Sequence, residues 1–281
     1  PCGSQFNEVE QICMGKPPMT KDNTSTTARV LALGEALVEF MPPIGESMRQ
    51  ASQWQKFAGG GPATYAAAIV RFGHAAALLS LVGEDPFSDY LLDALQQEGV
   101  DTAPIGRRPD RQIGLCYHEC IDGQTSLIFH RHDSAATTLC RDDIDPDLIA
   151  ASAALHVPGT TMQISENALD AARHALHMAR DCGVAVSFDP NIRAILGSTQ
   201  SSAAMEEGIA LADVVTPTLE EATAITGCDD PVKAARELRT RGPRLVAVTL
   251  AAEGCVLLRE GDDTPVFSPG FTVDVVEPTG A

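Results

Sequence analysis

From residue 142 onward, segments with the pattern of a buried strand alternate with segments that have the pattern of a helix. Consecutive strands that are joined through a helix run parallel, and a parallel sheet is buried on both faces. The order of elements therefore predicts an α/β fold with a mostly parallel central sheet between helices. The expected strands are 154–157, 184–188, 213–216 and 245–250, and the expected helices are 142–150, 165–182, 201–211, 219–226 and 231–240.

Strand and helix patterns also alternate in the first half of the chain, except in two places. Segments 35–57 and 104–132 contain β-rich runs, and the second of them holds an Asp122-Gly123 pair, which is a hairpin signal. We expect these segments to form a small β-sheet that covers a site as a lid. The parts that do fit are strands at 29–34 and 76–82 and helices at 62–72 and 86–98.

Residues 1–28 lack hydrophobic periodicity and are rich in Pro, Thr, Ser and Asn, so we predict a disordered tail there. The remaining residues, 29–281, hold enough apolar sequence for one large core. We therefore expect a single domain with a small subdomain.

The composition excludes some classes of partner. The net charge of −18 and the pI of about 4.6 would repel nucleic-acid phosphates and anionic membranes, so neither is expected to bind. No apolar run approaches the ~18 residues that span a bilayer, and no secretory signal is visible. Eight cysteines without a CxxC pair indicate a reducing cytoplasm.

A glycine-rich turn precedes the first long helix. Gly59, Gly60 and Gly61 lead into Pro62, which is typical of a helix start, and glycines allow a ligand to approach the backbone closely. The turn lacks the Lys-Ser or Lys-Thr of a P-loop and does not match GxGxxG. Taken by itself, it is also compatible with a tight turn that binds nothing.

Polar residues follow four of the predicted strands. Ligands of open parallel sheets bind at the carboxyl ends of the strands, so these tips are candidate site residues. Each tip can also be a helix cap, because Asp, Asn and Thr are favoured there. The tips are 189–193, 216–221, 249 and 277–281.

Eight stretches, in order along the chain, resemble the ribokinase-like (phosphofructokinase-B type) carbohydrate kinase family. The resemblance implies a three-layer α/β/α sandwich with a β-sheet lid that often makes a homodimer. It also implies ATP-dependent phosphorylation of a sugar or sugar acid with Mg²⁺, and leaves a need for a monovalent cation open. The stretches are Gly34-Glu35, Gly59–Ala63, Gly83–Phe87, Gln97–Asp101, His130–Ala136, Phe188–Arg193, Val248–Leu250 and Glu277–Ala281.

On the sugar side, the resemblance implies substrate contacts from the glycine turn, the lid and one strand tip. Thr64 stands where many members have Asn, and Glu39 stands where many have Asp. Arg131 matches a lid arginine, whose planar fork suits a carboxylate. The implied sugar-binding residues are Gly34, Glu39, Gly59, Gly60, Gly61, Thr64, Arg131, Asp189 and Arg193.

On the phosphate side, the resemblance implies that Glu221 binds Mg²⁺ through water. Gly280 and Ala281 match the anion hole, and the family's general-base Asp would follow Ala281. The chain as given lacks that Asp, so we expect this piece to be inactive. The implied nucleotide-binding residues are Asn191, Thr218, Glu221, Thr249 and Gly254.

The choice of substrate rests on the lid arginine. Arg131 and Arg193 suit a substrate with a carboxylate, and the surrounding stretches are most similar to 2-keto-3-deoxygluconate kinases. Fructokinases share the glycine turn and are the alternative, as is an inactive sugar-binding regulator on the same fold. Tyr117 and His118 alternate along a lid strand, so only one of them is expected to face a ligand.

Overall fold

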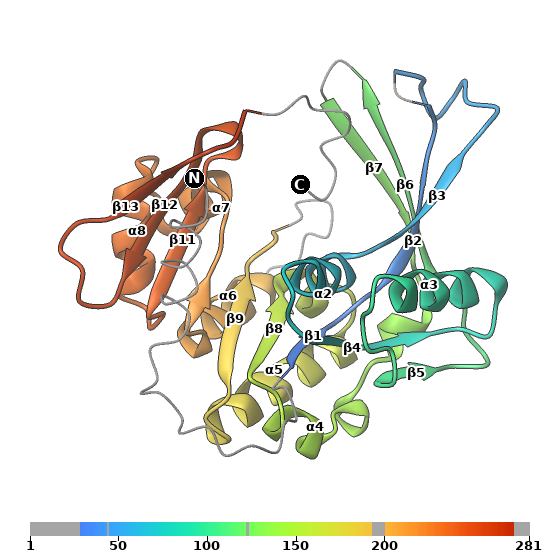
Figure 1. Cartoon of the computed structure of the whole chain (residues 1–281), viewed down its shortest axis with the longest axis horizontal. Coiled ribbons are helices and arrows are strands. Elements are labelled where there is room, and N and C mark those ends of the chain that lie inside the picture. The colour runs from blue at the N-terminus through green and yellow to red at the C-terminus, as the bar shows by residue number, and fades with distance from the viewer. Residues whose placement is uncertain (1–28, 44, 122–123, 193–199, 273–281) are drawn as a thin grey trace.

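A computed structural model describes residues 29–43, 45–121, 124–192 and 200–272 of the chain. Most of its strands belong to one nine-stranded sheet, whose order is β13-β12-β11-β10-β9-β8-β1-β4-β5 (Figure 1). The strands are β1 (Val30–Leu33), β4 (Ala76–Val82), β5 (Ile105–Arg107), β8 (Ala154–Pro158), β9 (Ala185–Asp189), β10 (Val214–Val215), β11 (Leu245–Thr249), β12 (Gly254–Arg259) and β13 (Val266–Pro269).

The sheet is parallel from β11 to β5, and β12 and β13 add an antiparallel edge. All seven residues of β4 are buried, as expected for a parallel strand that is covered on both faces. The parallel pairing aligns the carboxyl ends of β1, β8, β9, β10 and β11 along one edge.

Helices cover both faces of the large sheet. On β1, Ala32 packs with α2 (Gly61–Arg71) and α3 (Pro86–Gln97), whereas Leu31 and Leu33 belong to the core on the opposite face. That second core also contains α5 (Glu166–Asp181), whose five fully buried alanines let it lie close to the sheet. The remaining helices are α4 (Pro146–Ala150), α6 (Gln200–Leu211), α7 (Leu219–Thr226) and α8 (Pro231–Arg239), with 3₁₀ turns η1 (Ala135–Thr138), η2 (Arg141–Asp143), η3 (Gly159–Gln163) and η5 (Ala251–Glu253).

A separate four-stranded sheet projects from the body of the molecule, in the order β3-β2-β6-β7 (Figure 1). The β2–β6 pair is parallel and the other two pairs are antiparallel. Its strands are β2 (Leu37–Met41), β3 (Gln55–Gly59), β6 (Gly114–Ile121) and β7 (Gln124–His130).

The α/β fold with a mostly parallel sheet and a small second sheet is confirmed, with three changes of boundary. The predicted end of the first lid segment, 35–57, is too early, because β3 runs to Gly59. The predicted start of the second, 104–132, is also too early, because β5 pairs with β4 and so belongs to the large sheet. The helix expected at 142–150 starts only at Pro146, after Asp145 has capped its first turn. The tail 1–28 lies outside the described residues.

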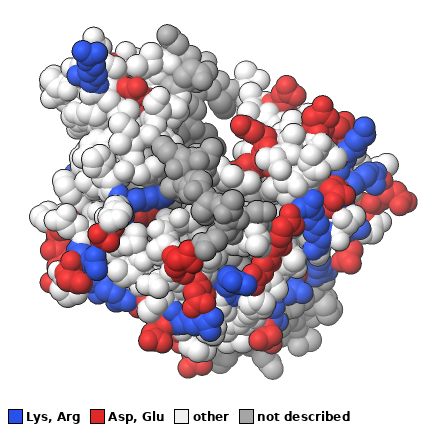
Figure 2. Space-filling model, turned by 180° about the vertical axis from the view of Figure 1, so that it is seen from behind, with Lys and Arg blue, Asp and Glu red and all other residues white. Residues whose placement is uncertain are grey.

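The surface carries interspersed charges. On the face turned away from the viewer in Figure 1, acidic and basic side chains of the described residues are intermixed over the lower and right-hand parts, and much of the upper left part carries no charge (Figure 2). Within the described ranges, no helix has both the length and the apolar character needed to cross a membrane.

Candidate active site

The glycine turn and the small sheet meet at the carboxyl edge of the large sheet. Gly60 caps α2 with a φ of 97°, and its N–H donates to Glu39 Oε1 of β2 at 3.3 Å. A side chain at Gly59 would displace the Glu39 carboxylate, because a Cβ there would collide with Glu39 Oε1. Thr64, one turn further along α2, is exposed. The structure therefore brings together Glu39 and the glycine turn, as the sequence predicted, at the base of the small sheet.

Gly61 differs from its neighbours because space is open beside it. A Cβ on Gly61 would meet nothing closer than Asn191 Nδ2 at 3.8 Å, whereas a Cβ on Gly60 would lie 2.6 Å from the Glu35 carbonyl oxygen. Gly61 is exposed at the start of α2. Of the three glycines, Gly61 is thus the one whose missing side chain leaves room for a ligand.

Arg131 is held by a residue that we did not predict. Its Nη1 donates to Glu35 Oε2 at 2.6 Å, and both side chains are largely buried, with 12% and 6% exposed. Ser134 Oγ donates to the other oxygen of Glu35 at 3.4 Å. Burial raises the pKa of the Glu35 carboxyl, against the opposing effect of Arg131. Arg131 is therefore a paired cation at the base of the lid and not a free one.

The two faces of the small sheet differ in character. Tyr117 stacks on Phe40 with ring centroids 5.3 Å apart, on the face that packs against α3. His118 lies on the opposite face, is 2% exposed, and places Nε2 3.6 Å from Glu39 Oε2. Of this pair, His118 is the residue on the side of the glycine turn.

The tip of β9 forms a tight turn. Asp189 Oδ1 accepts the N–H of Asn191 at 3.1 Å, and Asn191 adopts a φ of 38°, which is uncommon for a residue with a side chain. Because Asn191 Nδ2 lies near Gly61, this tip joins the glycine turn. Arg193, which was predicted to bind substrate, lies outside the described residues.

The tips of β10 and β11 continue the same edge. Thr218 and Glu221 form a capping box at the start of α7, in which each side chain accepts the other residue's backbone N–H. Glu221 also accepts the N–H of Ile192 at 2.7 Å. Thr249 pairs with Thr218 through a β-bridge, and its N–H donates to Pro217 at 2.9 Å. Thr218 and Thr249 are both exposed.

Two of the predicted glycines have a packing explanation. At Gly34 the φ is 140° and a side chain would collide with Thr161, and at Gly254 it would collide with the backbone of Ser268. The nearby Ala251 has a φ of 50°, a conformation that favours glycine. Gly34 and Gly254 still lie at the predicted edge, but their conformations alone account for them. The predicted anion hole, Gly280 and Ala281, lies outside the described residues.

A buried histidine and a partly buried tyrosine stack beside the glycine turn. His156 of β8 stacks on Tyr65 of α2, with ring centroids 3.6 Å apart, and its Nδ1 lies 3.0 Å from Ser187 Oγ. Burial lowers the pKa of His156 to about 3, so the ring is neutral at physiological pH. The pair ties the glycine-turn helix to β8 and β9.

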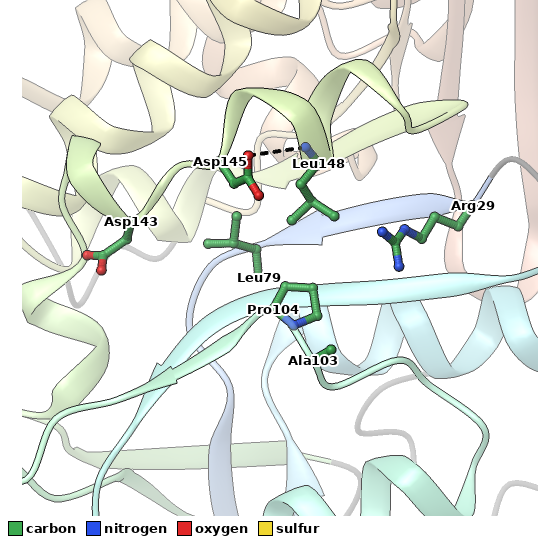
Figure 3. Close-up of a pocket in the computed structure, with 7 residues that line it drawn as sticks. All are labelled: Arg29, Leu79, Ala103, Pro104, Asp143, Asp145 and Leu148. Atoms are coloured by element: carbon green, nitrogen blue, oxygen red, sulfur yellow. Dashed lines mark hydrogen bonds between the residues drawn. The ribbon is translucent and has the colours of Figure 1, made fainter.

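A cavity of about 270 Å³ lies elsewhere, near the amino ends of β1, β5 and α4 (Figure 3). Its charged groups are already engaged: Arg29 pairs with Asp101, Asp143 pairs with Arg108, and Asp145 caps α4. We do not assign the active site to it. It is lined by Arg29, Leu79, Ala103, Pro104, Asp143, Asp145 and Leu148.

Glu35 and His156 were not among the predicted site residues. Glu35 carries one signal, an acid inside the apolar run Leu31–Val38, where an ionised group needs a partner. His156 carries a similar one, a ring inside the strand segment Leu155–Val157. Neither signal identifies the partner.

Comparison with known proteins agrees with this fold. The model of the pfkB family of carbohydrate kinases matches residues 27–281. Fructokinase-1 of Zea mays is 30% identical over 90% of this chain and 79% of its own length. The 2-dehydro-3-deoxygluconokinase of Thermoproteus tenax is 27% identical over 95% of this chain and 82% of its own. A solved structure from E. coli, described as a ribokinase II in complex with ATP and Mg²⁺, superimposes with a TM-score of 0.81 at 25% identity, covering 90% of this chain and 81% of that one.

Proposed function

Because the chain belongs to the pfkB family of carbohydrate kinases, we propose that it phosphorylates a hydroxyl of 2-keto-3-deoxygluconate with ATP. The observation that carries the choice of a sugar acid is Arg131. Its Nη2 is buried without a hydrogen-bond partner among the residues that the structure describes, whereas Nη1 is bound to Glu35.

A buried guanidinium nitrogen without a partner is costly, and an anionic oxygen is its best partner. Arg131 lies at the base of the small sheet, and the backbone of its partner Glu35 contacts the glycine turn at Gly60. The carboxylate of a sugar acid bound at that turn would therefore lie near Arg131. The relative from Thermoproteus tenax, named for the same sugar acid, supports this proposal.

In the proposed reaction the acceptor hydroxyl oxygen forms a bond to the γ-phosphorus of ATP. The bond from that phosphorus to the β,γ-bridging oxygen breaks, ADP leaves, and the hydroxyl proton passes to a base. The chain contributes chiefly positioning, which is the main source of rate in phosphoryl transfer. Glu39 and Gly61 hold the sugar side, and Thr218 and Thr249 line the phosphate side. The predicted anion hole falls at 280–281, beyond the described ranges.

The strand tips fit a nucleotide whose Mg²⁺ is held mainly by phosphates. No group of three His, Cys, Asp or Glu that could form an all-protein cage occurs in the described part of the chain. Mg²⁺ usually keeps several waters and takes only one or two carboxylates, and Glu221 is one of the carboxylates at this edge. When bound, Mg²⁺ neutralises phosphate charge. We propose Glu221 as its ligand through water, because both of its oxygens already accept backbone N–H groups.

Fructose is the second candidate acceptor. The Glu35 carboxylate offsets the charge of Arg131, which favours a neutral sugar over an anionic one. The maize relative is named a fructokinase. The two acceptors therefore need to be compared directly.

We also propose a homodimer through the small sheet. Trp54 and Ile128 expose large apolar surface there, 37% and 47% of each residue. The six cysteines in the described ranges are free thiols, which supports a reducing cytoplasm as the location.

The test is Mg²⁺-dependent ADP release by the full-length protein, with 2-keto-3-deoxygluconate and fructose assayed side by side. A much higher kcat/KM for the sugar acid, lost in Arg131→Ala, is the expected result. Arg141→Ala, which breaks an exposed ion pair with Asp170 on α5, is the matched control and should leave kcat/KM unchanged. A higher kcat/KM for fructose would make fructose the substrate in place of 2-keto-3-deoxygluconate. Binding of a sugar without turnover would indicate a sugar-binding regulator.

A further inference from the structure

Glu35 lies at the point where the chain leaves the large sheet for the small one. It stands between the last residue of β1, Leu33, and the first of β2, Leu37. Arg131 lies where the chain returns, directly after β7. The 2.6 Å bond between them thus links the outgoing and returning connections of the lid.

One further contact restricts the Arg131 guanidinium itself, and two others restrict the rest of the Glu35–Arg131 pair. Its Cζ lies 4.4 Å from the centre of the Phe129 ring, so that an aromatic face supports it. Ser134 holds the second oxygen of Glu35. Gly114 provides the space, because a Cβ there would lie 2.8 Å from Glu35 Oε1 and 3.2 Å from Arg131 Cβ. The guanidinium therefore has one orientation in which Nη1 is bound and Nη2 is not.

We infer that Glu35 is a positioning residue for the acceptor sugar: it fixes Arg131 so that Nη2, which is buried and unpaired among the described residues of the free protein, is the nitrogen left to bind a substrate oxygen. Glu35 does not touch the substrate in this arrangement and acts only through Arg131. The inference rests on the proposed function, since it takes the sugar to lie at the glycine turn.

The first test is a double-mutant cycle on sugar binding, measured by calorimetry without ATP. Glu35→Gln should weaken the binding of 2-keto-3-deoxygluconate or fructose about tenfold, and Arg131→Met should weaken it more. If Glu35 acts through Arg131, the double variant binds no more weakly than Arg131→Met alone. If the fold-losses in sugar affinity of the two single variants multiply in the double variant, the inference is wrong. Asp170→Asn, in the exposed Arg141 pair, is the control and should leave the Kd unchanged.

A second readout separates positioning from folding. Glu35→Gln should raise the KM for the sugar. Its kcat, measured at saturating sugar, should stay within about twofold of the wild-type value, because a correctly bound sugar reacts as before. Ser134→Ala removes a contact to Glu35 without removing its charge, and should raise KM by about threefold or less. Equal losses of kcat in both variants would contradict positioning.

The last measurement needs no sugar at all. In wild-type protein, slow rotation of the Arg131 side chain should give separate NMR signals for its two amino nitrogens, assigned by their loss in Arg131→Lys. Averaged signals in the wild type would overturn the inference, and so would separate signals that persist in Glu35→Gln. If the wild type binds neither sugar, the proposed function fails, and this NMR result decides independently whether Glu35 fixes Arg131.

Discussion

The carboxylate of Glu221 joins two neighbouring strand tips. One oxygen accepts the N–H of Ile192, which follows β9, at 2.7 Å, and the other accepts the N–H of Thr218, which follows β10, at 2.9 Å. The backbone at Ile192 and the backbone at Thr218 are thereby held together at the edge of the sheet. If this edge is the phosphate side of the site, as we propose, hydrogen bonds within the chain preorganise it before any ligand binds.

This arrangement predicts that Glu221 contributes more to stability than its helix cap does. Thr218→Ala removes the cap bond and should cost about 1 kcal/mol, whereas Glu221→Ala also frees Ile192 and should cost about 2 kcal/mol. Urea unfolding followed by circular dichroism measures both. Glu220→Ala, an exposed neighbour on the same turn, is the control with little expected change. Equal costs for the Thr218 and Glu221 variants would show that the link to Ile192 adds nothing.

His156 should make the protein less stable in acid. Its folded pKa of about 3 lies below the ordinary value of 6.5, so below pH 6.5 the unfolded state binds the proton and the folded state does not. Between pH 7 and pH 5 this group alone should lower the free energy of unfolding by about 2 kcal/mol.

His156→Gln tests this linkage, because Gln can still bond Ser187 but does not titrate. The difference in unfolding free energy between pH 7 and pH 5, from urea curves, should be smaller in the variant by about 2 kcal/mol. The same pH dependence in both proteins would mean that the ring takes up its proton without unfolding.

Much of the arrangement of the candidate site could be predicted because its signals are local. A glycine turn before an alanine-rich helix and polar residues after apolar strands are readable along the chain. The parallel topology then brings separate tips to one edge, as with Asn191 beside Gly61 and Thr218 beside Thr249. The position of these residues therefore followed from the order of strands.

The environment of each residue could not be predicted in the same way. Arg131 appeared to be a free carboxylate grip, but its partner Glu35 lies 96 residues away and the pairing depends on how the lid joins the body. Gly34 and Gly254 were predicted as ligand contacts, and close approach to Thr161 and Ser268 gives each a packing reason to be glycine that the sequence does not show. A sequence gives residue types along the chain, and packing decides which of them are left available for a ligand.

The Glu35–Arg131 pair predicts an asymmetry between its two single variants. Glu35→Gln leaves a buried guanidinium that cannot lose its proton, and should cost about 3 kcal/mol. Arg131→Met leaves a carboxyl that can become neutral by binding a proton, so it should cost less below the raised pKa of Glu35 and more as the pH rises through it.

Urea unfolding of both single variants and of the double variant, at pH 5 and pH 8, measures this asymmetry. The double variant has no buried charge and should be more stable than Glu35→Gln. Equal losses of unfolding free energy in the two single variants at both pH values would show that Glu35 is not neutralised by protonation when Arg131 is removed.

Gly61 should tolerate a side chain in the free protein and not in the complex with sugar. A Cβ there has 3.8 Å to its nearest neighbour, Asn191 Nδ2, and alanine favours a helix start over glycine, so Gly61→Ala should fold with unchanged or slightly higher stability. Sugar binding should nevertheless weaken at least about tenfold, because the methyl group occupies the space that we assign to the ligand.

Gly60→Ala is the matched comparison: the positive φ of Gly60 and the Glu35 carbonyl oxygen, 2.6 Å from the added Cβ, predict that this variant is less stable even without sugar. Thermal unfolding and calorimetric titration of the two variants separate these effects. If Gly61→Ala binds sugar as the wild type does, the acceptor does not lie at the glycine turn, and the placement of the substrate beside Arg131 is wrong with it.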